Sequence, residues 1–533
     1  MTGLEPALFS VALSFRDGGI MADSVQVIPV AHIYPEGCAF GSIEDIKGKT
    51  VVVMGLGLNG GGEASVRFLL KNGANVIATD MKTEEELKPT IDSIAADSSL
   101  DKSRLVYHLG GHSIEDFENA DCVIKNPGVK YDGNKFLAAA KAIETDISLF
   151  LHFSKAPIIA VTGSKGKSST VSAIHYGLRE AGFDAFLGGN ITVSPLSFID
   201  KTSEKTPVVL ELSSWQLADL RGRKLLRPKI SVITKIVPDH QNFYHSMIAY
   251  VADKKLIYAE QTKKDFAIFD FDDDAAADGG TLIENWGNIF AREAKARVLR
   301  YSRKALPKNV DGVWLDKNGR GKCRIGGTEE TILRDLVVPG KHIRTNCLNA
   351  ALVLRLMGVE AKKIAEIIGK WNGIEHRLEF FHEYKANGRS FRFYNDSAAT
   401  VPEATAAASQ SFDAPVILIA GGTDKGLDLS PIPLALSSPS AVRPESIYLL
   451  EGSATDKLLP LLSAEKIAVR GVYPSLDALL SALKSDIAGN AACGTERGIV
   501  VFSPGATSFG MFRNEFDRGN SFKDAVRRIF AGE

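Results

Sequence analysis

Residues 161 to 170 are Val-Thr-Gly-Ser-Lys-Gly-Lys-Ser-Ser-Thr, a glycine-rich loop between two regular patterns. The apolar run 157–161 before it predicts a strand, and residues 170–181 after it predict a helix. A strand that leads through glycines into a helix points backbone N–H groups and the positive helix end at an anion. Lys167 is then placed for the β- and γ-phosphates of a nucleotide, and Ser168 for Mg²⁺. The sequence therefore predicts an ATP site.

Length and composition indicate a multidomain protein that acts on small molecules. A chain of 533 residues exceeds what one core supports, so we expect two to four domains. The net charge of −1 provides no general attraction to nucleic acid or to a membrane surface. The five cysteines are scattered without Cys-x-x-Cys spacing, which is typical of a reducing cytoplasm. No apolar run is long enough to span a membrane, and we expect a cytoplasmic monomer.

Strand-like and helix-like patterns alternate along the chain, which predicts α/β architecture in three domains. Residues 1–45 are expected to be a loosely ordered leader, and the alternative is that Met21 is the true start. Residues 430–445, rich in Ser and Pro, predict a loop inside the last domain. The expected domains cover residues 46–152, 153–373 and 374–533.

The first domain carries a second glycine signature, Gly55-Leu-Gly-Leu-Asn-Gly60, directly after an apolar strand. A second strand, residues 75–79, ends at Asp80, which is the usual place for a ribose ligand in a dinucleotide fingerprint. Because such a turn holds any nucleotide diphosphate, the pattern alone also fits an NAD-dependent oxidoreductase. A simple dehydrogenase has no use for an ATP-type phosphate loop. Two nucleotide sites favour an enzyme that uses ATP to join a nucleotide-carried substrate to another molecule.

The central domain adds candidates for metal binding and catalysis. Glu211 ends an apolar strand in the same domain as the phosphate loop, the usual place for a Mg²⁺ ligand. Asp239 and His240 follow another strand, residues 229–234. Lys254 lies on a helix-like stretch, residues 250–258, where most lysines face solvent, so its role depends on resemblance.

The chain resembles the Mur ligase family from about residue 46 to its end. The resemblance rests on the phosphate loop, on the glycine signature at 55–60, and on further short motifs in family order. These motifs are Asn126-Pro-Gly128, Gly189-Asn190, Glu211-Leu-Ser-Ser-Trp-Gln216, Asp239-His240, Ala252-Asp-Lys254, Gly340-Lys-His342 with Asn346, Gly373-Ile-Glu-His-Arg-Leu-Glu379, Asn395-Asp-Ser397, Gly421-Gly-Thr-Asp-Lys425 and Ser503-Pro-Gly-Ala-Thr-Ser508.

The resemblance implies a three-domain fold: a Rossmann-like domain for a UDP-linked substrate, a P-loop ATPase-like domain with a mostly parallel sheet, and a Rossmann-like domain for an amino acid. The leading domain is similar to that of the members that add D-glutamate to UDP-N-acetylmuramoyl-L-alanine. The implied reaction is ATP-dependent amide bond formation through an acyl phosphate. It belongs to the synthesis of peptidoglycan precursors, which serves cell wall biogenesis, cell shape and cell division.

The resemblance also implies roles for single residues. Lys167, Lys254, His240 and Glu211 are the catalytic set. Ser168, Glu211, His240 and a CO₂-derived carbamate on Lys254 would hold two Mg²⁺ ions. ATP would contact Gly163, Ser164, Lys165, Gly166, Lys167, Ser168, Ser169, His342, Asn346 and Arg377. The UDP-linked substrate would contact Leu58, Asn59, Asp80, Lys82, Asn126, Gly128 and Asn190. The amino acid would contact Thr400, Lys425, Ser508 and Phe512.

One departure from the family pattern leaves the amino acid open. Ala398 follows Asn395-Asp-Ser397 where the D-glutamate enzymes usually present a lysine. A lost charged hydrogen bond is worth about 1.5–3 kcal/mol, so binding would weaken at least tenfold without compensation from Lys425 or Arg513. Two alternatives follow from the same sequence. One is a sibling ligase that adds a different amino acid, and the other is a nucleotide-binding protein without catalysis.

Overall fold

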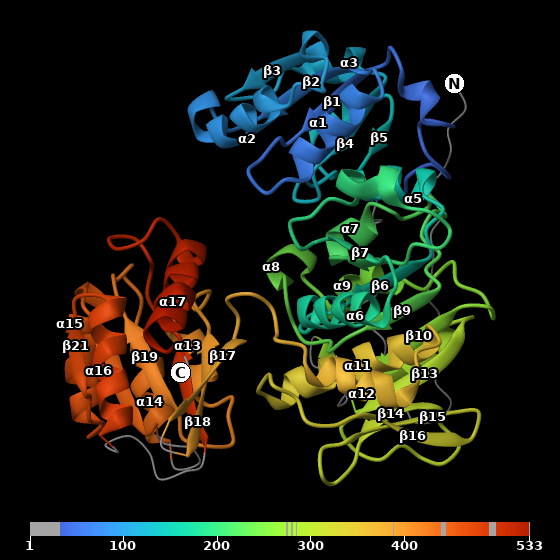
Figure 1. Cartoon of the computed structure of the whole chain (residues 1–533). Coiled ribbons are helices and arrows are strands. Elements are labelled where there is room, and N and C mark those ends of the chain that lie inside the picture. The colour runs from blue at the N-terminus through green and yellow to red at the C-terminus, as the bar shows by residue number, and fades with distance from the viewer. Residues whose placement is uncertain are drawn as a thin grey trace.

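Three α/β units follow one another along the chain (Figure 1). The structure, a computed structural model, describes residues 32–272, 285–386, 388–438, 444–489 and 497–531, together with the backbone of 276–278 and 281–283. Of the leader, residues 1–31 lie outside this description. The α/β class and the mostly parallel sheets predicted from the sequence are confirmed.

The first unit is a parallel five-stranded sheet of order β3-β2-β1-β4-β5, at the blue end of the chain (Figure 1). Central strand β1 is an apolar run buried at Val51, Val52 and Val53, as a sheet covered on both faces requires. The strands are β1 Thr50–Met54, β2 Asn75–Asp80, β3 Leu105–Leu109, β4 Cys122–Lys125 and β5 Ile143–Glu144. The helices are α1 Gly61–Lys71, α2 Glu84–Ala96, α3 Ile114–Asn119 and α4 Lys135–Ala139.

The central unit is a nine-stranded sheet of order β16-β15-β14-β13-β10-β9-β6-β8-β7. Only β14-β15 and β15-β16 pair antiparallel. The first strands along the chain are β6 Ile158–Thr162, β7 Phe186–Gly189, β8 Val208–Glu211, β9 Ile230–Ile233, β10 Phe266–Asp270 and β13 Arg297–Ser302. The last three are β14 Gly312–Leu315, which pairs parallel with β13, then β15 Gly321–Ile325 and β16 Thr328–Leu333. A separate hairpin joins β11 Ala276–Asp278 to β12 Thr281–Ile283.

Helices cover both faces of the central sheet. Helix α6 follows the phosphate loop directly and ends at Gly182, whose left-handed φ of 99° and N–H bonds to the last turn stop the helix. Helix α11 packs along α6 (Figure 1). The helices are α5 Asp146–Phe153, α6 Lys167–Ala181, α7 Ser214–Ala218, α8 Gln241–Tyr244, α9 Met247–Lys255, α10 Trp286–Glu293, α11 Lys341–Leu356 and α12 Ala361–Gly369.

The third unit is a six-stranded sheet of order β17-β18-β22-β19-β20-β21, in which only β17 and β18 pair antiparallel. The strands are β17 Glu379–Ala386, β18 Arg389–Asn395, β19 Ile417–Gly421, β20 Ser446–Leu450, β21 Gly471–Tyr473 and β22 Arg497–Phe502. The helices are α13 Pro402–Ser409, α14 Pro431–Ser437, α15 Ser453–Ala464, α16 Leu476–Ala488 and α17 Glu515–Ile529.

The predicted loop at 430–445 is wrong in its first half, because α14 occupies Pro431–Ser437. Pro431 stands at the first helical position, where its missing N–H costs nothing. Ile432 and Leu436, four residues apart, are both buried and hold the helix on the sheet. Proline therefore starts a helix here instead of preventing one. Residues 439–443 of the predicted loop lie outside the described part of the chain.

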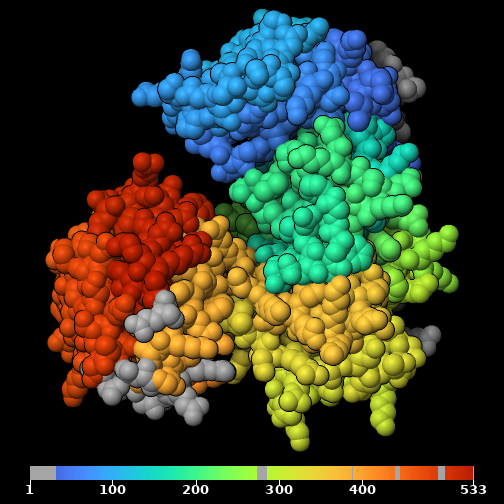
Figure 2. All heavy atoms as spheres, viewed as in Figure 1, coloured from blue at the N-terminus to red at the C-terminus, as the bar shows by residue number. Residues whose placement is uncertain are grey.

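The units join in different ways. One continuous core runs from the first unit into one face of the central sheet, through residues such as Val53, Phe150 and Leu210. Two separate cores fill the faces of the third sheet. The third unit contacts the central one at Tyr394, whose hydroxyl donates to the carbonyl of Val337 (2.8 Å). Figure 2 shows an open hollow between the red end of the chain and the blue first unit.

Candidate functional site

The phosphate loop has a backbone that only glycine allows at two positions. Gly163 and Gly166 have φ angles of 146° and 91°. A Cβ on Gly163 would lie 2.0 Å from Thr234 Oγ1, and one on Gly166 would lie 2.6 Å from Asn346 Oδ1. The N–H groups of Ser164 and Lys165 bond the carbonyl of Lys235 (2.9 and 3.2 Å), which ties the loop to the segment after β9. The loop therefore has the tight form that lets a backbone approach phosphate oxygens.

Two lysines converge on one carbonyl of this loop. Lys167 Nζ donates to Gly163 O (3.0 Å) and Lys254 Nζ donates to the same oxygen (2.9 Å). Burial lowers the pKa of Lys167. The pKa of Lys254 is lowered to about 7, first by burial and then by the neighbouring charge of Lys167. Lys254, only 1% exposed, therefore lies inside the protein and beside the phosphate loop, unlike most helix lysines.

Glu211 offers an unused carboxylate oxygen to the same region. It ends β8, is 1% exposed, and accepts a bond from Asn190 Nδ2 at Oε1 (3.1 Å). Its Oε2 is buried with no hydrogen-bond partner. A buried oxygen of this kind costs free energy unless a cation or donor reaches it. Glu211 together with the Ser168 hydroxyl therefore fits Mg²⁺, which binds one or two protein oxygens plus phosphates and waters.

His240 lies at the edge of this cluster. Its backbone is left-handed, with φ of 52°, and its ring centroid is 5.1 Å from that of Trp215 and 6.2 Å from that of Tyr250. Tyr250 in turn donates to Ser164 Oγ in the phosphate loop (3.1 Å). Within the described residues no three His, Cys, Asp or Glu side chains form a ready-made metal cage. A metal at this position would therefore depend on bound phosphates for most of its ligands.

The structure brings only part of the predicted ATP set to the loop. Asn346 on α11 is buried. Its side-chain amide packs against Gly166 and leaves no room there for a Cβ. His342 stands in the first turn of the same helix, and burial lowers its pKa. Arg377 is exposed near the start of the third unit. Burial raises the pKa of the nearby Asp396 carboxyl, and the positive charge of Arg377 acts in the opposite direction. Arg377 therefore lies with the third unit.

A cavity of about 250 Å³ lies between the first and central units, next to this cluster. Four of the residues predicted for the UDP-linked substrate line it, namely Asn59, Asn126, Gly128 and Asn190. Leu58, Asp80 and Lys82 are not among its lining residues. Asp80 accepts the N–H groups of Gly57 (2.9 Å) and Lys82 (3.0 Å), so its carboxylate braces the glycine turn.

Several lining residues were not predicted. They come from α1, from the ends of β4 and β7, from the start of α5 and from the start of α7. The additional residues with polar groups are Ser65, Lys125, Asp146, Thr192, Ser194, Ser213, Trp215 and Gln216. Ser213 and Gln216 belong to a capping box at the start of α7, a pattern visible in the sequence as Ser-x-x-Gln. Asp146 and Lys125 carry no comparable sequence signal, because only the fold brings them to the cavity.

The four residues predicted for the amino acid lie on adjacent loops after β18, β19 and β22. Thr507 N bonds Thr423 O (3.1 Å), which joins the loop of Ser508 to that of Lys425. Phe512 N bonds Ser508 O (3.1 Å) in the same loop. Gly505 N bonds Ala399 O (3.0 Å), next to Thr400. The carboxyl ends of parallel strands are the usual ligand edge of such sheets.

A buried arginine, not predicted from the sequence, crosslinks these loops. Arg518 on α17 is 2% exposed. Its Nε donates to Ser397 Oγ (3.0 Å) and its Nη1 to the carbonyl of Ala506 (2.9 Å). Its guanidinium places a positive charge beneath the loops that carry Thr400 and Ser508.

Models of two protein families match the chain. The Mur ligase middle domain matches residues 161–354, and the MurD-like N-terminal domain of Mur ligases matches residues 49–148. A solved structure of UDP-N-acetylmuramate-alanine ligase MurC from Thermotoga maritima has the same fold. Its TM-score is 0.50 at 17% identity, over 90% of this chain and 99% of that one.

Curated relatives cover nearly the whole chain. The UDP-N-acetylmuramoylalanine--D-glutamate ligase of Treponema pallidum (strain Nichols) is 40% identical over 91% of this chain and 98% of its own length. The enzyme of the same name from Borreliella burgdorferi (strain ZS7) is 39% identical over 91% and 99%. That from Roseiflexus sp. (strain RS-1) is 34% identical over 90% and 99%. The chain therefore belongs to the UDP-N-acetylmuramoylalanine--D-glutamate ligase family within the Mur ligases.

Proposed function

We propose that this protein is an ATP-dependent ligase that adds D-glutamate to UDP-N-acetylmuramoyl-L-alanine. The observation that carries the proposal is the contact between the cavity and the phosphate loop. Asn190 lines the cavity, and its amide binds Glu211, whose charge acts on Lys167 and Lys254. A substrate carboxylate reaching from the cavity past Asn190 would meet the γ-phosphate of ATP on the loop. The names of the curated relatives supply the substrate and the amino acid.

The reaction balances in two steps. A carboxylate oxygen of the alanyl group attacks the γ-phosphorus of ATP, ADP leaves, and an acyl phosphate forms. The D-glutamate amine then attacks the acyl carbon, the amine loses a proton, and phosphate leaves with one oxygen of the original carboxylate. Phosphoryl transfer depends mainly on positioning and on neutralising charge. Lys167 would neutralise the β- and γ-phosphates from the loop.

The same cluster would hold the metal. Ser168, Glu211 and His240 are its candidate ligands, and bound Mg²⁺ would stabilise negative charge on the phosphates. The unpartnered Glu211 Oε2 supports this assignment. Two ions, as the family resemblance implies, would need a further anionic group in the cluster.

Lys254 would supply that group as a carbamate. Its pKa of about 7 leaves much of the amine neutral near neutral pH, and the neutral amine is the form that reacts with CO₂. Addition of the nitrogen to CO₂ with loss of one proton turns a cation into a carboxylate-like oxygen ligand. It would also remove the repulsion between two buried ammonium groups that share Gly163 O.

The third unit would bind D-glutamate. Thr400, Lys425, Ser508 and Phe512 lie on its ligand edge, and Lys425 is exposed there as a counter-charge for a carboxylate. Ala398 lacks the ammonium that the D-glutamate enzymes usually present. The buried guanidinium of Arg518 beneath these loops, the exposed Arg513 and Lys425 together would compensate.

Phosphate release with a panel of amino acids tests the specificity. With ATP, Mg²⁺ and UDP-N-acetylmuramoyl-L-alanine, we expect release with D-glutamate and at least tenfold less with L-glutamate or other amino acids, as expected when a charged hydrogen bond is misplaced. Release with a different amino acid would identify a sibling ligase. No release with any would favour a nucleotide-binding protein without catalysis.

The proposed division of labour assigns the UDP-linked substrate to residues 46–152, ATP to 153–373 and the amino acid to 374–533. The protein would work as a cytoplasmic monomer in peptidoglycan precursor synthesis, and so in cell wall biogenesis, cell shape and cell division. In the described part of the chain, no helix is both long and apolar enough to cross a membrane.

A further inference from the structure

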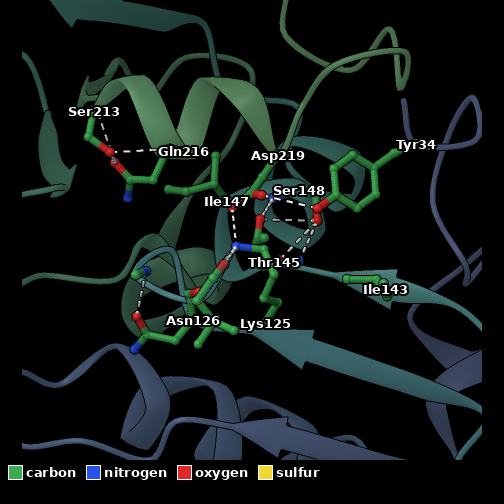
Figure 3. Close-up of polar contacts among 12 residues, drawn as sticks. Tyr34, Lys125, Asn126, Ile143, Thr145, Ile147, Ser148, Ser213, Gln216 and Asp219 are labelled. Atoms are coloured by element: carbon green, nitrogen blue, oxygen red, sulfur yellow. Dashed lines mark hydrogen bonds and ion pairs between the residues drawn. The ribbon is translucent and has the colours of Figure 1, made fainter. Parts of the chain in front are cut away.

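A buried ion pair joins the first unit to the central unit behind the substrate cavity. Lys125 Nζ lies 2.8 Å from Asp219 Oδ2, and the two side chains are 2% and 8% exposed. Lys125 ends β4, and Asp219 caps the C-terminus of α7 (Figure 3). The pair therefore connects two walls of one cavity, because Asn126 and Gly128 follow Lys125 while Ser213 and Gln216 begin α7.

The ammonium group of Lys125 also shapes the loop beside it. Besides Asp219, Nζ bonds the carbonyls of Val129 (2.8 Å) and Asn126 (3.2 Å). These carbonyls stand on either side of the turn 127–128. The ammonium group therefore donates hydrogen bonds to both carbonyls of the turn and forms an ion pair with Asp219. Lys125 thus fixes both ends of the turn that lines the cavity and anchors them to α7.

Asp219 occupies a position that destabilises an unpaired carboxylate. It stands at the C-terminal end of a helix, where the helix dipole repels negative charge. Burial raises the pKa of Asp219 to about 6, and the charge of Lys125 is the largest influence in the opposite direction. The ionised form of Asp219 therefore depends on the charge of Lys125. Through this ion pair, Asp219 holds the residue from which the loop 126–128 starts.

The leading segment covers the pair from the other side. The Tyr34 hydroxyl donates to Asp219 Oδ1 (3.2 Å), and Tyr34 N bonds the carbonyl of Arg221 (2.9 Å). The Arg223 guanidinium lies 4.3 Å from the centre of the Tyr34 ring and pairs with Glu144 of β5 (2.9 Å). Both side chains of this second pair are 2% exposed. Tyr34, which lies beside Asp219 in Figure 3, therefore packs between two buried ion pairs that link the same two units.

We propose that Lys125 and Asp219 are positioning residues for the UDP-linked substrate, holding the loop 126–128 at a fixed distance from the start of α7. This inference rests on the proposed function, since it requires that the cavity receives that substrate. The pair does not touch ATP, whose loop lies on β6 and α6. Its effect is therefore confined to binding of the nucleotide sugar.

The test measures binding of two ligands to variants that remain folded. In Lys125→Met/Asp219→Asn neither partner is left as an unpaired buried charge, so the thermal unfolding midpoint should stay close to that of the wild type. Calorimetry should give a Kd for UDP-N-acetylmuramoyl-L-alanine about 10- to 100-fold higher, as expected for a loop that is misplaced by about 1 Å. The Kd for a non-hydrolysable ATP analogue should stay the same.

The matched control is an exposed ion pair at the opposite end of β4. Lys49 and Asp121 precede β1 and β4, lie 3.6 Å apart and are 47% and 42% exposed. Lys49→Met/Asp121→Asn should change neither Kd. Lys125→Arg, which keeps the positive charge, decides the question if the double variant unfolds. A planar guanidinium cannot reproduce the two carbonyl hydrogen bonds and the ion pair of the ammonium group together, so the Kd of this variant for the nucleotide sugar should also rise about tenfold.

Three outcomes are separable. A raised Kd for the nucleotide sugar alone, in a folded variant, supports the inference. An unchanged Kd in folded Lys125→Met/Asp219→Asn, or in Lys125→Arg, overturns it and leaves the proposed function intact. Absence of binding by the wild-type protein overturns the proposed function, and the inference with it.

Discussion

Lys167→Met should lower the kcat for phosphate release by about 10²- to 10³-fold or more, while the protein stays folded. The side chain keeps its length but loses the charge that faces the β- and γ-phosphates, and removal of one preorganised charge-stabilising group typically has this effect. In the absence of nucleotide, Lys167 only bonds two carbonyls of its own loop (3.0 and 3.2 Å). The unfolding midpoint should therefore change little.

Lys155→Met is the control for this variant, because Lys155 is an exposed lysine just before β6. Its phosphate release should match that of the wild type within about twofold, as for most surface substitutions. A folded Lys167→Met protein with the kcat of the wild type would show that the lysine of the phosphate loop takes no part in catalysis.

Lys254→Ala should lose activity by more than about 10²-fold, because it would remove the carbamate proposed as a metal ligand, and loss of one preorganised charge-stabilising group typically has an effect of this size. The lost side chain is buried and leaves a space beside Gly163 O. A short-chain carboxylic acid such as propionate should enter this space and restore part of the activity if the native group is a carbamate. Initial rates with and without added propionate measure the rescue.

Lys255→Ala provides the matched control on the same helix. Lys255 points to Glu293 (2.8 Å) and is 29% exposed, so its loss should affect activity less than about fivefold. The carbamate proposal would be contradicted if propionate restored no activity to Lys254→Ala and if removal of CO₂ left the wild-type activity unchanged. Lys254 would then act as an amine.

Local patterns in the sequence predicted most of the fold. The phosphate loop, its strand and its helix follow from glycines and apolar runs within a dozen residues, and the structure has β6 and α6 there. Strands β19 Ile417–Gly421, β20 Ser446–Leu450 and β22 Arg497–Phe502 likewise coincide with local apolar runs. The loop predicted over α14 was wrong because the burial of Ile432 and Leu436 depends on the sheet beneath them.

The site was harder to predict because its geometry is set by contacts between distant segments. Nothing local shows that Lys254 is buried, and the helix pattern alone favours solvent. Lys125 and Asp219 are 94 positions apart in the printed sequence and meet only when the first and central units pack together. Asp80 stays a prediction as a ribose ligand, and only the fold shows that its carboxylate oxygens also accept the backbone N–H groups of Gly57 and Lys82.

The most direct measurement follows the substrate oxygen through the reaction. UDP-N-acetylmuramoyl-L-alanine labelled with ¹⁸O in the alanyl carboxylate is incubated with ATP, Mg²⁺ and D-glutamate, and both products are analysed by mass spectrometry. The proposed function predicts a product extended by one glutamyl residue and one ¹⁸O atom in each released phosphate. Phosphate without label, or no extended product, would contradict ligation through an acyl phosphate.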